Sequence, residues 1–448
     1  MTRSPSGPGF FREHPVRPVA HQDPLLRSKG VYLAPGPEKG VGGAEARPRI
    51  GFACQWDEIP ERTWSYTPWH LREALRSVTE TTDTGFQIPR LSRTVLRAIH
   101  TRYHGRLTST WGSSPLTEAY VERALRRELS RTPAERRCDA VLTMYELAAT
   151  LPVPFFIYSD VSYDAAISAA GSIEAYAASK GLSPSAVARL RDRQVSIYER
   201  ASGIIAMSHW FARSLVQQTG VPEEKIHVVH AGINNAGTSG PRGTDVSAAS
   251  GAASTQPYLP VRERPGPRRR LLFAGRGDFY GKGGDLVLAA LAVLRREYDA
   301  RITLTVAGPA SWPLPGTPPE GVQFLGTVPS GELAALYDSH DLLVMPSRLE
   351  AFGIVFTEAL ARGLPCVARD AYAMPEIVTP GVSGALVASD DEHELAAVIA
   401  TTLGDDALYE ACHDRAAEFA AYFSWERAAQ EMVEIIKQEL GSVPLNIG

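Results

Sequence analysis

Two glutamates in the second half of the chain have the type and spacing of ligand-binding residues. Glu350 precedes a predicted helix over 353–362, and Glu358 lies inside it. Gly353 at the turn lets the backbone approach a ligand closely, and the free N–H groups over 353–355 would point toward an anion. Each carboxylate can accept two hydrogen bonds, which suits the hydroxyl groups of a sugar. Taken alone, the segment also fits an ordinary capped helix with two surface glutamates.

A glycine-rich loop upstream carries two cations. The loop over 275–284 joins a predicted strand over 271–274 to a predicted helix over 285–298. Arg276 offers a planar fork of donors and Lys282 a point charge, a combination that suits a diphosphate. The spacing differs from the phosphate loop of nucleoside triphosphatases and from the Gly-x-Gly-x-x-Gly of nicotinamide binders. A solvated turn is the alternative interpretation.

With both motifs considered together, the chain resembles family four of the retaining glycosyltransferases, the glycosyl transferases group 1. The ordered matches are Gly275-Arg276, Lys282-Gly283, Glu350 and Glu358 with the intervening Phe352-Gly353, Val306-Ala307-Gly308, Phe324-Leu325-Gly326 and Met374-Pro375-Glu376-Ile377-Val378. The resemblance covers roughly residues 48–440, closely in the second half and loosely in the first. It implies an α/β protein of the GT-B fold, with two facing Rossmann-like doubly wound domains, a cleft between them and a C-terminal helix that crosses back to the first domain.

Composition and the alternation of strands with helices divide the chain into five parts. Residues 1–47 are rich in Pro, Gly and charge and are expected to form a disordered tail, and residues 236–268 have the Gly, Ser and Ala content of a flexible linker. Between and after them we expect a Rossmann-like acceptor domain over 48–235, a Rossmann-like nucleotide-sugar domain over 269–424, and a crossover helix with a tail over 425–448. Predicted strands lie at 49–54, 139–143, 154–158, 203–207, 225–229, 271–274, 302–306, 322–325, 342–345 and 365–367.

The resemblance implies a role for each matching residue. Arg276 and Lys282 would hold the diphosphate, Glu350 the donor sugar, and Glu358 the ribose, while residues 325–327 would flank the base. The implied donor-binding set is Gly275, Arg276, Lys282, Leu325, Gly326, Glu350, Phe352, Gly353, Ile354, Val355 and Glu358. The predicted catalytic residues are Arg276, Lys282, Glu350 and Asp160.

The first half departs from the family pattern at two positions. Tyr66 stands where the family commonly has a glycine beside the sugar and phosphates, and Asp160 stands where many relatives have a histidine. Asp160 is therefore a candidate contact to donor or acceptor, with a capping aspartate at a strand end as the alternative. Trp64, Tyr66 and Trp69 offer aromatic faces for an acceptor, although packing within the loop explains them equally well.

These features predict a retaining, metal-independent hexosyltransferase. Its donor would be a nucleotide diphosphate sugar, of UDP or GDP type, with no further cofactor and no metal site. The acceptor would be a carbohydrate, a lipid or a small-molecule aglycone. An epimerase of the same fold that acts on a nucleotide sugar, and a non-catalytic binding subunit, are the alternatives.

Charge and hydropathy limit the partners. A formal net charge of −4 argues against a protein devoted to nucleic acid, and the sequence contains no apolar run of eighteen residues. Without a signal peptide, a cytoplasmic protein with reduced cysteines is expected. Five arginines recur along one predicted helical stretch and permit at most a peripheral contact with anionic lipid, a solvated basic face being the alternative. They are Arg90, Arg93, Arg97, Arg102 and Arg106.

Overall fold

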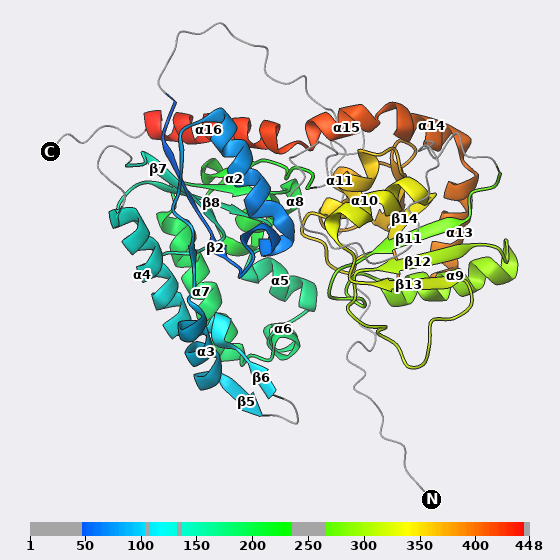
Figure 1. Ribbon diagram of the computed structural model, residues 1–448, viewed down its shortest axis with the longest axis horizontal. Helices are drawn as coiled ribbons and strands as arrows, with labels where there is room; N and C mark the ends of the chain where they lie inside the picture. Colours follow the sequence, from blue (N-terminus) through cyan, green and yellow to red (C-terminus); the bar gives the residue numbers. More distant parts are fainter. Residues whose placement is uncertain (1–46, 104–106, 132–136, 235–265, 443–448) are drawn as a thin grey trace, which may run out of the picture. The chain divides into compact units, whose positions relative to one another are not determined.

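Two six-stranded sheets, each parallel throughout, form the framework of the protein in a computed structural model (Figure 1). The structure describes residues 47–103, 107–131, 137–234 and 266–442. The expected tail over 1–47 and linker over 236–268 lie outside these ranges, apart from Arg47 and residues 266–268. Both sheets belong to one compact unit.

The first sheet has the strand order β10-β9-β8-β7-β1-β3. Its strands are β1 (Ile50–Ala53), β3 (Thr81–Asp83), β7 (Ala140–Met144), β8 (Phe155–Ser159), β9 (Gly203–Ala206) and β10 (Ile226–Val228). The direction of winding reverses between β1 and β7. We call the part of the chain built on this sheet the first domain.

The second sheet has the order β13-β12-β11-β14-β15-β16. Its strands are β11 (Arg270–Ala274), β12 (Thr303–Ala307), β13 (Val322–Gly326), β14 (Leu342–Met345), β15 (Cys366–Arg369) and β16 (Gly384–Val387). Winding reverses between β11 and β14, and ligands of doubly wound sheets bind outside the carboxyl ends of the strands at such a reversal. The part built on this sheet is the second domain.

Helices connect the strands in both domains. Those of the first are α2 (Thr67–Val78), α3 (Arg90–Ile99), α4 (Pro115–Arg131), α5 (Tyr163–Ala170), α6 (Ile173–Lys180), α7 (Pro184–Arg200) and α8 (His209–Ser214), which continues as a π turn over Leu215–Thr219. Those of the second are α9 (Gly284–Glu297), α10 (Ser330–Ser339), α11 (Ile354–Leu360), α12 (Met374–Ile377), α13 (Glu392–Gly404), α14 (Asp406–Asp414) and α15 (Ala416–Tyr422). Within the described ranges, none of the helices is both long and apolar enough to cross a bilayer.

Small elements decorate the first domain. They are a parallel pair of β2 (Gln55–Trp56) with β4 (Phe86–Gln87), an antiparallel hairpin of β5 (Thr101–Tyr103) with β6 (Leu107–Ser109), and the 3₁₀ helices η1 (Pro60–Tyr66), η2 (Trp111–Ser113) and η5 (Glu223–Lys225).

Burial explains why most central strands could be predicted. Every residue of β1 and of β14 is buried, as is typical of parallel strands covered by helices on both faces. The edge strands β3 and β16 are missing from the predicted set. β3 reads Thr-Thr-Asp and is only partly buried, so it lacks the continuous apolar run of an interior strand.

The final helix, α16 (Trp425–Ser442), crosses back onto the first domain as expected. It packs on α2, and Met432 and Ile436 share one apolar core with Leu71 of α2. The Trp425 indole N–H donates to Asn234 Oδ1 at 2.9 Å. Each fully buried aliphatic side chain of this kind stabilises the fold by about 1.5–3 kcal/mol.

Candidate active site

The glycine-rich loop over 275–284 lies at the reversal point of the second sheet, between the end of β11 and the start of α9. Gly308, which follows β12, has φ +124°, and a Cβ atom there would stand 2.4 Å from the Gly275 carbonyl oxygen. At Gly283, where φ is +75°, a Cβ atom would stand 2.6 Å from the Pro346 carbonyl oxygen. Both positions therefore require glycine, and the loop packs closely against the ends of two other strands.

Lys282 and Glu350 meet at this point although they are 68 residues apart in the chain. Lys282 Nζ lies 2.6 Å from Glu350 Oε2, and Ser347 Oγ donates to the same oxygen at 3.3 Å. The Glu350 residue is 9% exposed. The structure thus brings together a cation and a carboxylate from the two predicted motifs, in the place where a ligand of this fold binds.

Arg276 differs from Lys282 in its surroundings. It is exposed, and no polar group within the described ranges contacts its side chain. Its guanidinium is therefore ready to bind an anion without first breaking an internal contact.

Glu358 lies deeper than Glu350. It is 4% exposed, and the Tyr337 hydroxyl donates to its Oε2 at 2.9 Å. Burial, followed by the Glu358 charge, raises the pKa of Tyr337 well above its ordinary range. The ribose-binding role of Glu358 stays a prediction.

The turn before α11 has the conformation expected from its glycine. Gly353 has φ +96° and is the N-cap of the helix. Phe352 is buried beside His230 and Phe423, with ring centroids at 5.8 and 6.3 Å. Ile354 is half-buried at the first helical position, so the start of α11 borders this apolar group.

The predicted base-binding side lies at the ends of β12 and β13. Leu325 is 37% exposed, and Gly326, with φ +70°, accepts a hydrogen bond from the Gly308 N–H at 2.8 Å. Trp312, which no sequence motif singled out, packs its ring on Phe324 with centroids 5.5 Å apart. Its indole N–H is buried without a partner in the described structure. Such a donor costs about 1–3 kcal/mol unless a ligand accepts from it.

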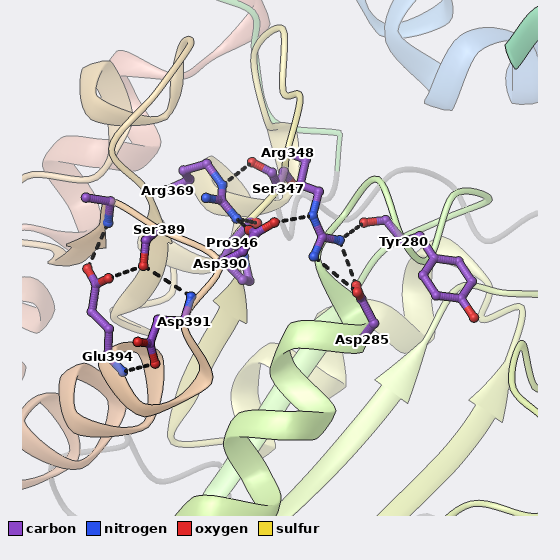
Figure 2. A network of polar contacts seen from close by, with 11 residues as sticks. Tyr280, Asp285, Pro346, Ser347, Arg348, Arg369, Ser389, Asp390, Asp391 and Glu394 are labelled. Atoms are coloured by element: carbon purple, nitrogen blue, oxygen red, sulfur yellow. Dashed lines mark hydrogen bonds and ion pairs between the residues drawn. The ribbon is translucent and has the colours of Figure 1, made fainter. Parts of the chain in front are cut away.

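A second missed group is an arginine network that joins the glycine-rich loop to the end of β14 (Figure 2). Arg348 donates to the Tyr280 carbonyl at 2.6 Å, to Asp285 at 2.7 and 3.1 Å, and to Asp390 at 2.8 Å. Its own N–H donates to the Gly281 carbonyl at 2.8 Å. Burial alone would lower the pKa of Arg348, but the two carboxylates raise it above its ordinary value.

Arg369 completes this network from β15. Its guanidinium donates to the carbonyl oxygens of Ser347 at 3.1 Å and Pro346 at 3.2 Å, and it pairs with Asp390. The two arginines therefore hold both the loop that carries Lys282 and the segment that leads to Glu350.

Asp160, which follows β8 in the first domain, is influenced by the charges of both Glu350 and Lys282. Burial, and then the charge of Glu350, raises the pKa of Asp160 from 3.8 to about 7, while Lys282 acts in the opposite direction. Its Oδ1 is buried and accepts no hydrogen bond from the described residues. The structure thus places Asp160 within electrostatic reach of Lys282 and Glu350.

The loop before α2 retains a glycine-like backbone without glycine. Trp64, Ser65 and Tyr66 have φ values of +39°, +56° and +70°, and Tyr66 is the N-cap of α2. Tyr145, at the end of β7, has φ +63°, and its ring packs on Trp64 with centroids 4.2 Å apart. Left-handed non-glycine residues cost about 1–3 kcal/mol each and cluster at functional sites.

Two of the predicted acceptor aromatics, Trp64 and Trp69, have different neighbours. Trp64 contacts Tyr145, whose pKa is raised by burial and then by the Asp160 charge. Trp69 instead packs on Trp56 at 6.4 Å and lies under the Arg72 guanidinium at 4.1 Å. Trp64 is therefore the better candidate for contact with a ligand.

Two pockets lie away from the Lys282–Glu350 contact. One of about 260 Å³ in the first domain is lined by polar residues that include Glu118, Glu146 and Arg193. Another of about 530 Å³ includes Arg268 and Leu403. Arg268 precedes β11, so this larger pocket lies at the amino end of that strand, opposite the edge where such sheets bind ligands.

Glu376 of α12 links the two domains. Its carboxylate accepts from the backbone N–H groups of His209 at 2.7 Å and Trp210 at 2.5 Å, and lies 3.4 Å from His230 Nε2. Burial would raise its pKa, but the contacts with His230 and His209 lower it overall. In the described part of the chain, no group of three or more His, Cys, Asp or Glu side chains could hold a metal ion.

Comparison with known proteins identifies relatives of this chain. Residues 258–419 match the model of the family described as glycosyl transferases group 1. The D-inositol 3-phosphate glycosyltransferase of Corynebacterium glutamicum strain R is 28% identical over 220 residues, which cover 44% of this chain and 52% of the relative. The D-inositol 3-phosphate glycosyltransferase 1 of Catenulispora acidiphila is 29% identical over 260 residues, 55% of this chain and 59% of the relative. The chain spans about half the length of the curated relatives it matches.

Solved structures match over most of the chain. Sucrose-phosphate synthase from Thermosynechococcus elongatus superposes with a TM-score of 0.61 at 17% identity, and covers 89% of this chain and 100% of its own. Anabaena Alr3699/HepE, solved with UDP and glucose, gives a TM-score of 0.56 at 17% identity over 87% of this chain and 99% of its own. At such identities the likeness shows the fold alone. The chain has the GT-B fold, and its residues 258–419 match the family of glycosyl transferases group 1.

Proposed function

We propose that the protein is a retaining glycosyltransferase that moves a sugar from a nucleotide diphosphate sugar to an acceptor. The observation that carries this proposal is the 2.6 Å contact between Lys282 Nζ and Glu350 Oε2 at the reversal point of the second sheet. One partner suits a diphosphate and the other suits sugar hydroxyls, so the two halves of such a donor would find complementary groups side by side.

In the proposed reaction, the bond between the anomeric carbon and the phosphate oxygen breaks, and its electron pair stays on the leaving diphosphate. Lys282 and Arg276 stabilise that growing negative charge without a metal ion. Donors that are held in position before the reaction act without reorganisation, and each is typically worth on the order of 100- to 1000-fold in rate. Glu350 accepts hydrogen bonds from the sugar and keeps it oriented.

Retention follows if the acceptor attacks from the face that the diphosphate leaves. The leaving phosphate oxygen then takes the proton of the acceptor hydroxyl, and no separate general base is required. The proposed acceptor side is the first domain, where Trp64, Tyr145 and Asp160 come together. The acceptor class and the UDP or GDP type of the donor stay open, and a cytoplasmic location is proposed from the sequence expectation.

A screen with purified protein tests the proposal. Nucleotide sugars are ranked by thermal stabilisation, since a ligand at about 100 times its Kd adds about 2.7 kcal/mol. The best donor is then incubated with candidate acceptors, and products are identified by mass spectrometry and NMR. A retained anomeric linkage supports the proposal. An epimerised donor formed without acceptor, or binding without any turnover, contradicts it.

Charge-neutral variants test the role of the two cations. Arg276→Gln is the cleaner one, because its side chain has no polar partner in the described structure and folding should not change. Arg276→Gln combined with Lys282→Met should lower kcat by at least about 100-fold. Exchange of two exposed cations, Arg301→Gln with Lys180→Met, is the matched control. Unchanged turnover in a folded double variant would contradict the proposal.

A further inference from the structure

An apolar stripe on α3 faces solvent. Leu91, Val95 and Ile99 are 78%, 52% and 47% exposed and recur every four residues, which places them on one face of the helix. Leu96, on another face, is buried and anchors α3 to the first domain. The helix lies at the end of that domain that carries the β5–β6 hairpin (Figure 1).

The stripe is part of a wider apolar patch. Ile59 and Leu116 are 47% and 58% exposed. Glu58, next to Ile59, pairs with Arg93 of α3, and α3 contacts η2, which immediately precedes α4 and Leu116. Of the nine large hydrophobic side chains that are exposed in the described residues, five belong to this patch. Such concentration of exposed aliphatic groups marks a contact surface rather than scattered surface residues.

Positive charge accompanies the patch. Residues 88–131 contain nine arginines and three glutamates and no aspartate or lysine, a formal charge of +6, whereas the whole chain carries −4. The rest of the chain therefore carries −10. On α3 itself, which has no acidic residue, Arg90 and Arg97 are exposed and lie on a different face of the helix from the stripe. Arg97 Cζ lies 5.6 Å from the Trp111 ring centroid, and the Arg97 residue is exposed to solvent.

The apolar stripe and the arginines together indicate which kind of partner would bind here. An exposed aliphatic stripe on a helix that also carries exposed arginines and no acidic residue is the pattern of a helix that lies in the plane of a membrane interface. A nucleic acid would be met by aromatic and polar groups rather than by leucine, valine and isoleucine. We propose that α3, with Ile59 and Leu116, docks on an anionic lipid surface, where the aliphatic side chains enter the boundary of the acyl chains and the arginines face lipid phosphates. This inference does not depend on the proposed transferase activity.

Vesicle flotation with the full chain tests the proposal. We expect the protein to float with phosphatidylcholine vesicles that contain phosphatidylglycerol and to stay at the bottom with phosphatidylcholine alone. High salt should lower the partition coefficient at least about tenfold, because the attraction of surface charges is screened. Equal recovery with neutral vesicles, or none with anionic ones, would overturn the proposal. Binding to an acidic protein or self-association without flotation would overturn it too.

Matched variants separate the apolar and the charged contributions. Leu91→Ser with Val95→Ser and Ile99→Ser should lower the partition coefficient at least about tenfold, since each lost aliphatic side chain removes buried apolar area. Val216→Ser with Tyr298→Ser, at exposed apolar positions elsewhere, should float like the wild type.

For the charges, Arg90→Gln with Arg97→Gln should reduce flotation, whereas Arg296→Gln with Arg301→Gln, which removes the same charge from the second domain, should not. Donor-induced thermal stabilisation and near-ultraviolet circular dichroism, unchanged in all variants, exclude misfolding. Flotation of the α3 variants at the wild-type level would contradict the proposal.

Discussion

Three ionisable side chains that follow three different strands define the chemistry of the candidate site. Lys282 lies between two acids, in direct contact with Glu350 and within electrostatic reach of Asp160. Burial of Asp160 and the charge of Glu350 outweigh the opposite effect of Lys282, so the pKa of Asp160 is raised to about 7. Near neutral pH this group can donate a hydrogen bond as well as accept one. A histidine, which many relatives of the resembled family are expected to have at this position, could do the same.

Replacing Asp160 by asparagine should change how stability depends on pH. The folded state keeps the proton that the unfolded chain releases near pH 3.8, so wild-type stability falls as the pH rises from about 4 to about 7. Asp160→Asn has no carboxyl group to titrate, so its stability should not fall over this pH range for this reason. Its melting temperature should exceed that of the wild type at about pH 8 but not at about pH 4, with a free-energy difference on the order of 1–4 kcal/mol.

Thermal melts across this pH range check the prediction. Asp192→Asn, which removes an exposed carboxylate, is the control and should melt in parallel with the wild type. A difference between Asp160→Asn and the wild type that stays constant with pH would refute the titration of Asp160.

At the scale of elements, the site depends on how the loop over 275–284 is held against the end of β14. The loop itself has few buried side chains, and Phe279, 3% exposed, is its main apolar anchor. Polar contacts supply the rest. Arg348 bonds to the loop backbone at Tyr280 and Gly281 and to Asp285 in the first turn of α9 (Figure 2). Arg348 is thus a positioning residue for Lys282.

Arg348→Met should release the loop and misplace Lys282. Because a displacement of about 1 Å can cost about 100-fold in rate, we expect kcat/KM to fall by about 10- to 100-fold. Arg348→Lys, which can keep one contact, should lose less. Stability should change little, since partly exposed ion pairs are usually worth about 0–1 kcal/mol. Steady-state kinetics and thermal melts measure both effects.

Arg362→Met is the matched control. Arg362 pairs with Asp338 of α10 at 2.8 Å and is about as exposed as Arg348, but its ion-pair partner lies outside the loop over 275–284. It should keep nearly full activity. If the two variants lost the same amount of stability and the same amount of activity, Arg348 would not act by positioning Lys282.

Local patterns predicted most of the sheet strands, but not β3 or β16, and also the two motifs, because these depend on neighbours in the chain. Apolar runs gave β1, β7, β8, β9, β11 and β14, and glycine spacing gave the loop over 275–284. The arginine network could not be predicted this way. Arg348, Asp285 and Asp390 are each ordinary surface charges in the sequence, and only the fold brings them together across 42 and 63 residues.

Backbone strain was also invisible in the sequence. Trp64, Ser65 and Tyr66 belong to residue types that seldom adopt positive φ, so nothing local indicates a left-handed turn. Tertiary contacts impose it: Asn234 Nδ2 donates to the Ser65 carbonyl at 2.6 Å, and Trp425 holds Asn234. The family resemblance marked Tyr66 as unusual, and the structure supplies the physical consequence.

At the scale of the whole molecule, two kinds of contact join the domains. The α16 helix extends the core of the second domain onto α2, which is an apolar, pH-independent connection. The second contact is polar: Glu376 of α12 accepts hydrogen bonds from the backbone N–H groups at the start of α8. Ser208, the N-cap of α8, also donates to the Ala351 carbonyl at 3.3 Å, next to Glu350. The polar connection therefore reaches the candidate site directly.

Glu376→Gln should weaken this connection in a pH-dependent way. A carboxylate whose folded pKa is lowered stabilises the fold above its unfolded pKa, and that stability is lost as the pH falls through the folded value. An amide keeps an acceptor but loses the charge that strengthens both backbone bonds. We therefore expect a loss of about 1–3 kcal/mol at neutral pH, which shrinks in acid.

Calorimetry from about pH 4 to about pH 8 measures the effect. The difference in free energy of unfolding between wild type and variant should shrink as the pH falls, because Glu376 then takes up a proton. Glu410→Gln, an exposed carboxylate of α14, is the control and should match the wild type throughout. A difference that is equal at all pH values would show that packing, not charge, matters at Glu376. Since α8 and Ala351 both border this contact, a purely electrostatic loss should also raise the donor KM at low pH in the wild type. The variant, already without the charge, should lack that rise.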